Sequence, residues 1–140
     1  MTRPALIVTA LATCLMSAAV QAETINYHAT LTGAAEVPPN KTGGTGTATA
    51  TIDTDTKMLS YTVQYSGVSG PATAGHFHGP AGAGKTAAVL IPIMAPLGSP
   101  ILGMARLSDA EIADFQAGNV YVNIHTEKNP DGEIRGQMSK

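Results

Sequence analysis

Residues 24–31 read Thr-Ile-Asn-Tyr-His-Ala-Thr-Leu, and their side chains alternate between polar and apolar along the whole stretch. Successive side chains of a β-strand point to opposite faces of a sheet, so this period of two predicts a strand with one face in the core. Residues 47–52 and 59–65 repeat the pattern, and the polar residues 53–57 between them predict a hairpin connection. We therefore expect a sheet that starts near residue 24.

Three further strands are predicted downstream. Residues 89–94 are a short apolar run that we expect to be buried on both faces, at a sheet edge or a bulge because Pro92 has no amide hydrogen to donate. Residues 120–126 and 133–138 are predicted to pair as a hairpin, since the Asn-Pro-Asp-Gly sequence at 129–132 is a strong turn signal.

One helix is predicted near residues 108–117. Ser108 and Glu111 have the spacing of a capping box, Leu107 and Ile112 that of a hydrophobic staple, and Gly118 is a natural C-terminal stop. The fold class that we predict is all-β: an antiparallel Greek-key β-sandwich of about seven or eight short strands with this one short helix.

The first 22 residues have the three parts of a secretory signal peptide. Arg3 supplies the positive charge, residues 5–20 are largely apolar, and the Val-Gln-Ala sequence at 20–22 predicts the cleavage site. We expect a periplasmic or secreted protein whose mature domain, residues 23–140, has no transmembrane segment. Cleavage removes the single cysteine, Cys14, and leaves no disulfide; a lipoprotein with lipid on Cys14 is the alternative.

The charge of the chain argues against one class of partner. It has 8 Lys and Arg, 10 Asp and Glu and a formal net charge of -2, and its basic residues form no stripe. We therefore expect no nucleic-acid partner. We expect a monomer, and a protein partner of unknown identity stays open.

Residues 79–86, Gly-Pro-Ala-Gly-Ala-Gly-Lys-Thr, match the phosphate-binding P-loop pattern letter for letter. A P-loop runs from a buried parallel strand into a helix, whereas the sequence after Thr86 is β-like and contains Pro92 and Pro96. We therefore predict a flexible loop and expect no nucleotide cofactor.

Three histidines are the candidate metal ligands. His76 and His78 flank Phe77, so on a strand both imidazoles leave the same face while Phe77 points into the core. His125 lies on the outward face of the strand predicted at 120–126. Imidazole ligands suit copper or zinc, and a mature domain without cysteine cannot form a blue-copper site.

The predicted hairpin register places Arg135 opposite His125 and Glu127 opposite Glu133. A cation beside His125 disfavours the imidazolium form and so favours the neutral ring that binds metal. A purely structural hydrogen-bond network that pins the hairpin is the alternative, and it would use Asn123, Glu127, Glu133 and Arg135. His28 is expected at the surface, and four methionines have the spacing of core residues: Met58, Met94, Met104 and Met138.

Four blocks of sequence resemble the CHRD domain, a family named after chordin and common in exported bacterial proteins. The blocks occur in family order and are residues 31–39 (Leu-Thr-Gly-Ala-Ala-Glu-Val-Pro-Pro), 75–80 (Gly-His-Phe-His-Gly-Pro), 118–126 (Gly-Asn-Val-Tyr-Val-Asn-Ile-His-Thr) and 129–137 (Asn-Pro-Asp-Gly-Glu-Ile-Arg-Gly-Gln). The resemblance implies an immunoglobulin-like or Cu/Zn superoxide dismutase-like sandwich at residues 23–140, with no assigned activity. The His-x-His pair is similar to the copper site of that dismutase, but the disulfide cysteines and the histidines of a two-metal site are missing, so dismutase activity is not expected.

These observations leave three functional hypotheses. The first is an exported domain that binds copper or zinc through His76, His78 and His125. The second is a non-catalytic structural or protein-interaction module, with residues 43–46 and 79–84 as candidate loops. An enzyme is the least supported, because the sequence shows no catalytic triad, cysteine nucleophile or clear carboxylate pair.

Overall fold

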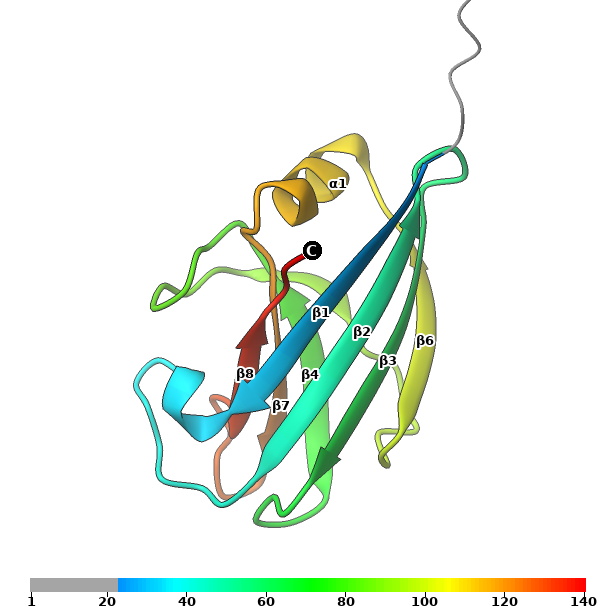
Figure 1. Cartoon of the computed structure of the whole chain (residues 1–140). Helices are drawn as coiled ribbons and strands as arrows, with labels where there is room; N and C mark the ends of the chain where they lie inside the picture. Colours follow the sequence, from blue (N-terminus) through cyan, green and yellow to red (C-terminus); the bar gives the residue numbers. More distant parts are fainter. Residues whose placement is uncertain (1–22) are drawn as a thin grey trace, which may run out of the picture.

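The computed structural model describes residues 23–140, which fold into an antiparallel β-sandwich with one short α-helix (Figure 1). The signal peptide predicted at residues 1–22 lies outside the described part. In chain order the elements are β1 (Thr24–Thr32), η1 (Gly33–Ala35), β2 (Thr45–Asp53), β3 (Met58–Ser66), β4 (Ala72–His78), β5 (Val89–Pro92), β6 (Ile101–Arg106), α1 (Asp109–Gln116), β7 (Tyr121–Thr126) and β8 (Ile134–Gln137).

The eight strands of residues 23–140 form one sheet in the order β5-β4-β7-β8-β1-β2-β3-β6. Its two halves meet where Thr32 of β1 pairs with Arg135 of β8, and an isolated bridge between His28 and Ser139 adds a second contact at this junction. The sheet folds over at this junction, so β1, β2, β3 and β6 lie in one layer and β4, β7 and β8 in the other (Figure 1). The all-β antiparallel prediction is confirmed; the Greek-key connectivity and the immunoglobulin-like or dismutase-like detail stay predictions.

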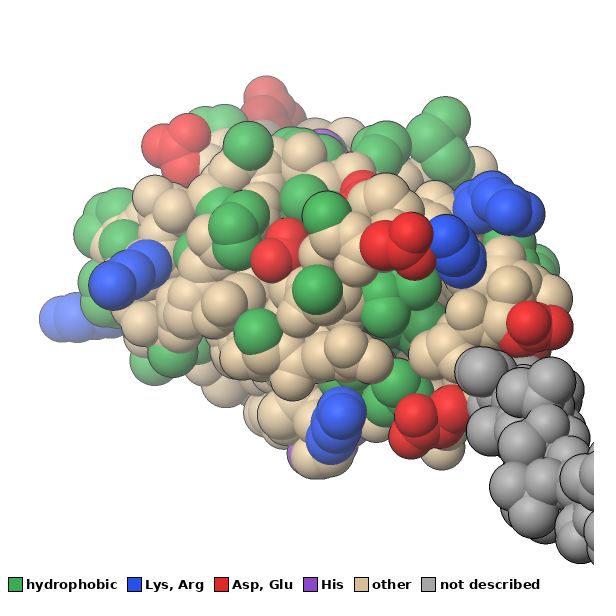
Figure 2. All heavy atoms as spheres, turned by 90° about the horizontal axis from the view of Figure 1, so that it is seen from above, with side chains coloured by type: hydrophobic (Ala, Val, Ile, Leu, Met, Phe, Trp, Pro, Cys, Tyr) green, Lys and Arg blue, Asp and Glu red, His purple; other side chains and the backbone are tan. Residues whose placement is uncertain are grey.

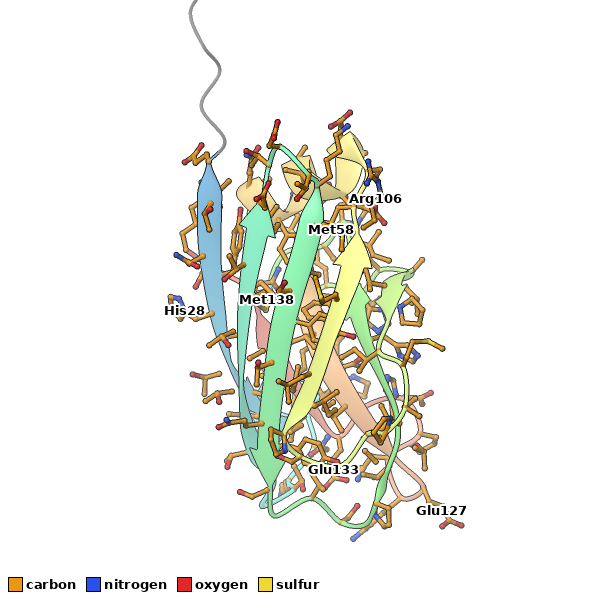
Figure 3. All side chains as sticks on the ribbon, turned by 90° about the vertical axis from the view of Figure 1, so that its right-hand side faces the viewer. His28, Met58, Arg106, Glu127, Glu133 and Met138 are labelled. Carbon is orange, nitrogen blue, oxygen red and sulfur yellow. The ribbon has the colours of Figure 1, made fainter. Side chains whose placement is uncertain are left out.

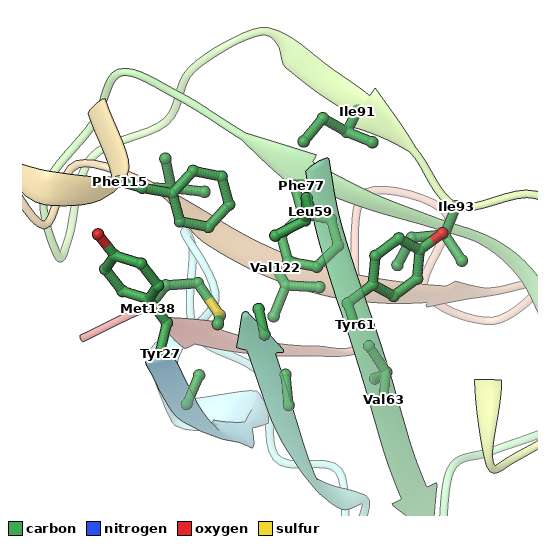
Figure 4. Close-up of a cluster of buried hydrophobic side chains, with 14 of the residues drawn as sticks. Tyr27, Leu59, Tyr61, Val63, Phe77, Ile91, Ile93, Phe115, Val122 and Met138 are labelled. Carbon is green, nitrogen blue, oxygen red and sulfur yellow. The ribbon is translucent and has the colours of Figure 1, made fainter. Parts of the chain in front are cut away.

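The alternating pattern predicted three of these strands well. Residues 24–31, 47–52 and 59–65 lie within β1, β2 and β3, and each strand buries its apolar face. Tyr61 of β3 packs edge-on against Phe77 of β4, with ring centroids 5.1 Å apart, and this contact joins the two layers (Figure 4). The inner face of β4, opposite the face that carries the histidines, therefore packs against a buried apolar core.

Helix α1 closes one end of the sandwich (Figure 1). Its predicted capping box is present, since the Ser108 hydroxyl accepts from the amide of Glu111 and the Glu111 carboxylate accepts from the amide of Ser108. Phe115 is buried and packs against Tyr27, with ring centroids 5.3 Å apart. Gly118, with φ of 71°, follows the helix end as predicted. Seen from this end, acidic and basic side chains are scattered among one another (Figure 2).

Two predictions about the sheet edges were wrong. The strand at 89–94 is the edge strand β5, as Pro92 indicated, but only its inner face is buried: Val89 is 47% exposed. Met94 and Met104, predicted in the core, are 73% and 67% exposed because each lies on the solvent side of a sheet edge. Met138 is fully buried, as expected. Within residues 23–140, none of the helices has the length and apolar character needed to cross a membrane.

Candidate metal centre

Strand β4 carries two of the candidate ligands on its outer face. His76 and His78 are two residues apart, so their imidazoles leave the sheet on the same side, and Phe77 between them is fully buried. The neighbouring strand β7 sets Asn123 opposite His76, with His125 at the next outward position. The structure therefore brings all three predicted residues together: one ring nitrogen from each histidine lies within 4.8 Å of the others.

The three imidazoles pack closely. Nδ1 of His76 lies 3.0 Å from Nε2 of His125, and their ring centroids are 4.9 Å apart. The centroid of His78 is 5.4 Å from that of His76 and 6.5 Å from that of His125. His78 and His125 are only 9% and 8% exposed, whereas His76 is half-buried. The cluster is thus shielded from water, with His76 on its solvent side.

Backbone carbonyls fix the tautomer of two of the rings. Nδ1 of His125 lies 2.8 Å from the carbonyl oxygen of Pro130, and Nδ1 of His78 lies 3.0 Å from that of Ala87. A carbonyl oxygen can only accept, so each Nδ1 carries a proton and donates it. In the neutral rings, Nε2 therefore presents a lone pair to the cluster. A backbone carbonyl on the remote nitrogen is the usual support of a metal-binding histidine.

Asn123 adds a further electron-rich atom. Its Oδ1 lies 3.0 Å from Nε2 of both His78 and His125. Nδ1 of His76 can donate a hydrogen to Nε2 of His125. The contacts of Asn123 are different, because the lone pair of each Nε2 and the amide oxygen are both acceptors and neither can donate to the other. The two contacts of Asn123 therefore have no hydrogen between their atoms when both rings are neutral. Such a convergence of acceptors suits a cation.

The surroundings favour the neutral forms of His76 and His78. Burial holds the pKa of His76 below its usual range, and the neighbouring His125 and His78 lower it further. Burial also lowers the pKa of His78; hydrogen bonds with Ala87 and Asn123 oppose this shift, and nearby charge adds to it. Neutral imidazole is the form that coordinates metal ions.

The predicted register of the β7–β8 hairpin was wrong by two residues. Arg135 pairs with Asn123, not with His125, and Ile124 pairs with Ile134. The reason is that Glu133 is drawn into the interior by hydroxyl and amide donors, so it cannot pair with a residue at the exposed turn. A shift of two residues keeps every side chain on its predicted face, so Ile134 is still in the core.

Arg135 is part of an aromatic stack. Its Cζ lies 3.4 Å from the ring centroid of Tyr121, a close cation–π contact. The Tyr121 ring lies parallel to His78, with 4° between the planes and 4.8 Å between the centroids. The guanidinium is 2% exposed and donates to the carbonyls of Gly82 and Lys85. The stack therefore supports one face of His78 and places a buried positive charge near the cluster.

The P-loop-like sequence at residues 79–86 forms the loop that covers this stack. The loop is followed by edge strand β5 and not by a helix. Two carbonyl groups of the loop, those of Gly82 and Lys85, accept from the guanidinium of Arg135. The loop therefore lacks the helix N-terminus on which phosphate binding by a P-loop depends.

Glu36 was not predicted as part of the site. It is 6% exposed and lies in the segment after η1, where its carboxyl group and the amide of Asn123 both lie beside Gly132. Burial raises its pKa to about 7, although Arg135 and hydrogen bonds from Asn123 and Val37 lower it. Its Oε1 is buried without a hydrogen-bond partner. Sequence offered one signal, a glutamate within an otherwise apolar and proline-rich stretch at 34–39.

Glu133 was likewise not predicted as a buried residue. It is 0% exposed, and its carboxylate accepts from the amide and hydroxyl of Ser69 and from the hydroxyls of Thr42 and Thr126. Burial raises its pKa, but these hydrogen bonds outweigh that effect and hold it at about 2. In Figure 3 Glu133 lies inside the molecule, whereas Glu127 projects from the turn. Glu133 thus ties together three segments beside the histidine cluster.

His28 lies apart from this cluster. It is exposed on β1, where its backbone pairs with Ser139 (Figure 3). The prediction of a surface position is confirmed.

The fold places this protein among the all-β sandwich domains, and its distinguishing feature is the shielded histidine cluster on one outer face. The CHRD domain model matches residues 27–138, nearly all of the described part of the chain. The chain therefore belongs to the CHRD domain family. Neither a search of curated proteins nor a search of solved structures finds a match.

Proposed function

We propose that this chain is an exported metal-binding domain that holds one copper or zinc ion with His76, His78 and His125. The convergence of lone pairs carries the proposal. Nδ1 of His78 and Nδ1 of His125 are committed to backbone carbonyls, so both Nε2 atoms face Oδ1 of Asn123 without a shared hydrogen. A metal ion bound to Nε2 of both rings would relieve this contact and engage His76 on the solvent side.

The dimensions of the cluster support a single ion. Metal–nitrogen bonds of 2.0–2.1 Å allow two ligand nitrogens to be at most about 4.2 Å apart. The three nitrogens lie within 4.8 Å, so contraction by about half an ångström brings them into range. Rotation of the half-buried His76 ring is the simplest route to that contraction.

The proposal includes an extracytoplasmic site of action. The signal peptide predicted at residues 1–22 would deliver the domain to the periplasm or the medium. Three neutral imidazoles leave the fourth position of a tetrahedral ion for a solvent molecule or another ligand. Copper and zinc are the ions that an all-imidazole set favours.

Metal titration followed by NMR of the histidine side chains tests the proposal. One equivalent of zinc(II) is expected to shift the ring nitrogens of His76, His78 and His125 and to leave His28 unchanged. His125→Ala is expected to weaken zinc binding by about tenfold or more, since removing one ligand costs at least 1.4 kcal/mol. His28→Ala is the matched control, because His28 is exposed on the other layer.

The structural alternative makes a different prediction in the same experiment. If His76, His78 and His125 only fasten the covering loops, stoichiometric zinc(II) or copper(II) leaves all three rings unperturbed. His125→Ala then lowers the unfolding temperature by the same amount with and without metal. Either result refutes a metal-binding role.

A further inference from the structure

An exposed methionine follows the edge strand next to β4, which carries His76 and His78. Met94 follows edge strand β5 and is 73% exposed. The amide of Ile93 donates to the carbonyl of Gly75, so the pairing of β5 with β4 continues past the end of β5. Extending the register of β5 and β4 by one more residue sets Met94 opposite Ala74.

Alternation along the strand puts Met94 on the same face as the histidines. Ile93 points into the core and is 6% exposed, so its neighbour Met94 points outward. Since Pro92 pairs with His76, Met94 is the diagonal neighbour of His76. Diagonal neighbours on adjacent strands are about 7–8 Å apart, a distance that a long side chain can span.

The space between Met94 and the cluster is lined by a small side chain. Ala74 separates Met94 from His125 in the same cross-strand row, because Ala74 pairs with His125 on its other side. Alanine contributes only a methyl group, so the row leaves room for the thioether to fold over it. Methionine has three rotatable side-chain bonds and adapts to such a position easily.

We propose that Met94 supplies the fourth ligand of the histidine site and that the site takes copper(I). This inference rests on the proposed metal-binding function and names the ion. Thioether sulfur is a soft ligand that selects copper(I), whereas zinc(II) has no such preference.

Charge near the site favours the same ion. The three imidazoles and the thioether are all neutral, so the bound ion keeps its full charge. Arg135, 2% exposed, holds a buried positive charge on Tyr121, which stacks on His78, and the buried carboxyl of Glu36, with its pKa raised to about 7, offsets this charge only in part. Placing a single positive charge in such surroundings costs less than placing two.

Competition for copper(I) tests the inference. The protein is titrated under anaerobic conditions with copper(I) held by the chromogenic chelator bicinchoninate, and zinc(II) affinity is measured separately. Met94→Leu keeps the apolar volume but removes the sulfur. We expect it to weaken copper(I) binding by about tenfold or more, equivalent to 1.4 kcal/mol per tenfold, and to leave zinc(II) affinity unchanged. X-ray absorption is expected to show one sulfur neighbour of copper in the wild type and none in Met94→Leu.

Met104→Leu is the matched control, because Met104 is 67% exposed on β6, at the opposite edge of the sheet. It should leave copper(I) binding unchanged. If the wild type binds copper(I) and zinc(II) but Met94→Leu binds copper(I) equally well, the role of Met94 is refuted and the histidine site stands. If the wild type binds neither ion, both proposals fail.

Discussion

Replacing Asn123 by aspartate would put a negative charge where a neutral amide oxygen now lies 3.0 Å from Nε2 of His78. An opposite charge at such a distance raises a histidine pKa by about 1–3 units, and each unit corresponds to about 1.4 kcal/mol. Burial holds the pKa of His78 below its usual range in the wild type. The substitution is therefore expected to bring the pKa of His78 to its usual range or above it.

A pH titration of the His78 ring by NMR, without metal, measures this shift directly. A folded-state pKa raised above the unfolded value gives stability that is fully present below the unfolded pKa and is lost as pH rises through the folded pKa. Asn123→Asp should therefore unfold in urea more readily as pH rises through that range. Asn26→Asp, on the exposed face of β1, is the control for added charge alone. If His78 titrates identically in Asn123→Asp and the wild type, Asn123 does not face it as described.

Four further outcomes are expected. Glu133→Ala removes the acceptor of four hydrogen bonds and should lower the free energy of unfolding in urea by about 3 kcal/mol or more, so a loss under about 1 kcal/mol contradicts its role. In the wild type the same carboxylate, with its pKa lowered from 4.5 to about 2, stabilises the fold above pH 4.5, and circular dichroism should show that contribution disappearing as pH falls toward about 2. In the metal-free protein, NMR should show the rings of His76 and His78 titrating below the ordinary histidine range, and either ring titrating at its ordinary pKa would contradict the burial effect. Gly136→Ala would place a methyl group 2.5 Å from the Thr30 carbonyl oxygen and should cost about 1–3 kcal/mol in the same urea assay, with a neutral result contradicting the close approach of β8 to β1.

Local sequence pattern predicted the strands whose two faces differ. Strands β1, β2 and β3 alternate cleanly, and the capping box identified α1. Strand β6 was not predicted because its pattern is inverted: Leu102 and Met104 face solvent, and Gly103 supplies no side chain to the inner face. Its inner surface is instead filled by Tyr61 of the neighbouring strand. Because the side chain that fills the inner face of β6 belongs to β3, the sequence of β6 itself does not show the alternating pattern of a strand.

The same distinction holds for the site. The grouping of His76 and His78 follows from strand periodicity alone, and His125 could be added from its face on β7. The convergence of Glu36 on Asn123, and the stack of Arg135 on Tyr121, depend on how distant segments fold back over the sheet. The burial of Glu133 also depends on distant segments, since its hydrogen-bond donors come from elsewhere in the chain. This burial is the reason that the observed hairpin register differs from the predicted one by two residues.

Pairing between β4 and β7 also fixes when the cluster can form. His76 and His125 are 49 residues apart in the chain, and β7 and β8 are the last strands to be synthesised. A chain that is still emerging carries His76 and His78 without His125, so it cannot hold an ion with all three rings. Under the proposed function, metal would therefore be bound only after the sandwich has closed. Once bound, the ion would add RT ln(1 + [M]/Kd) to the free energy of unfolding. It would do so by linking β7, which is synthesised late, to β4, which is synthesised earlier.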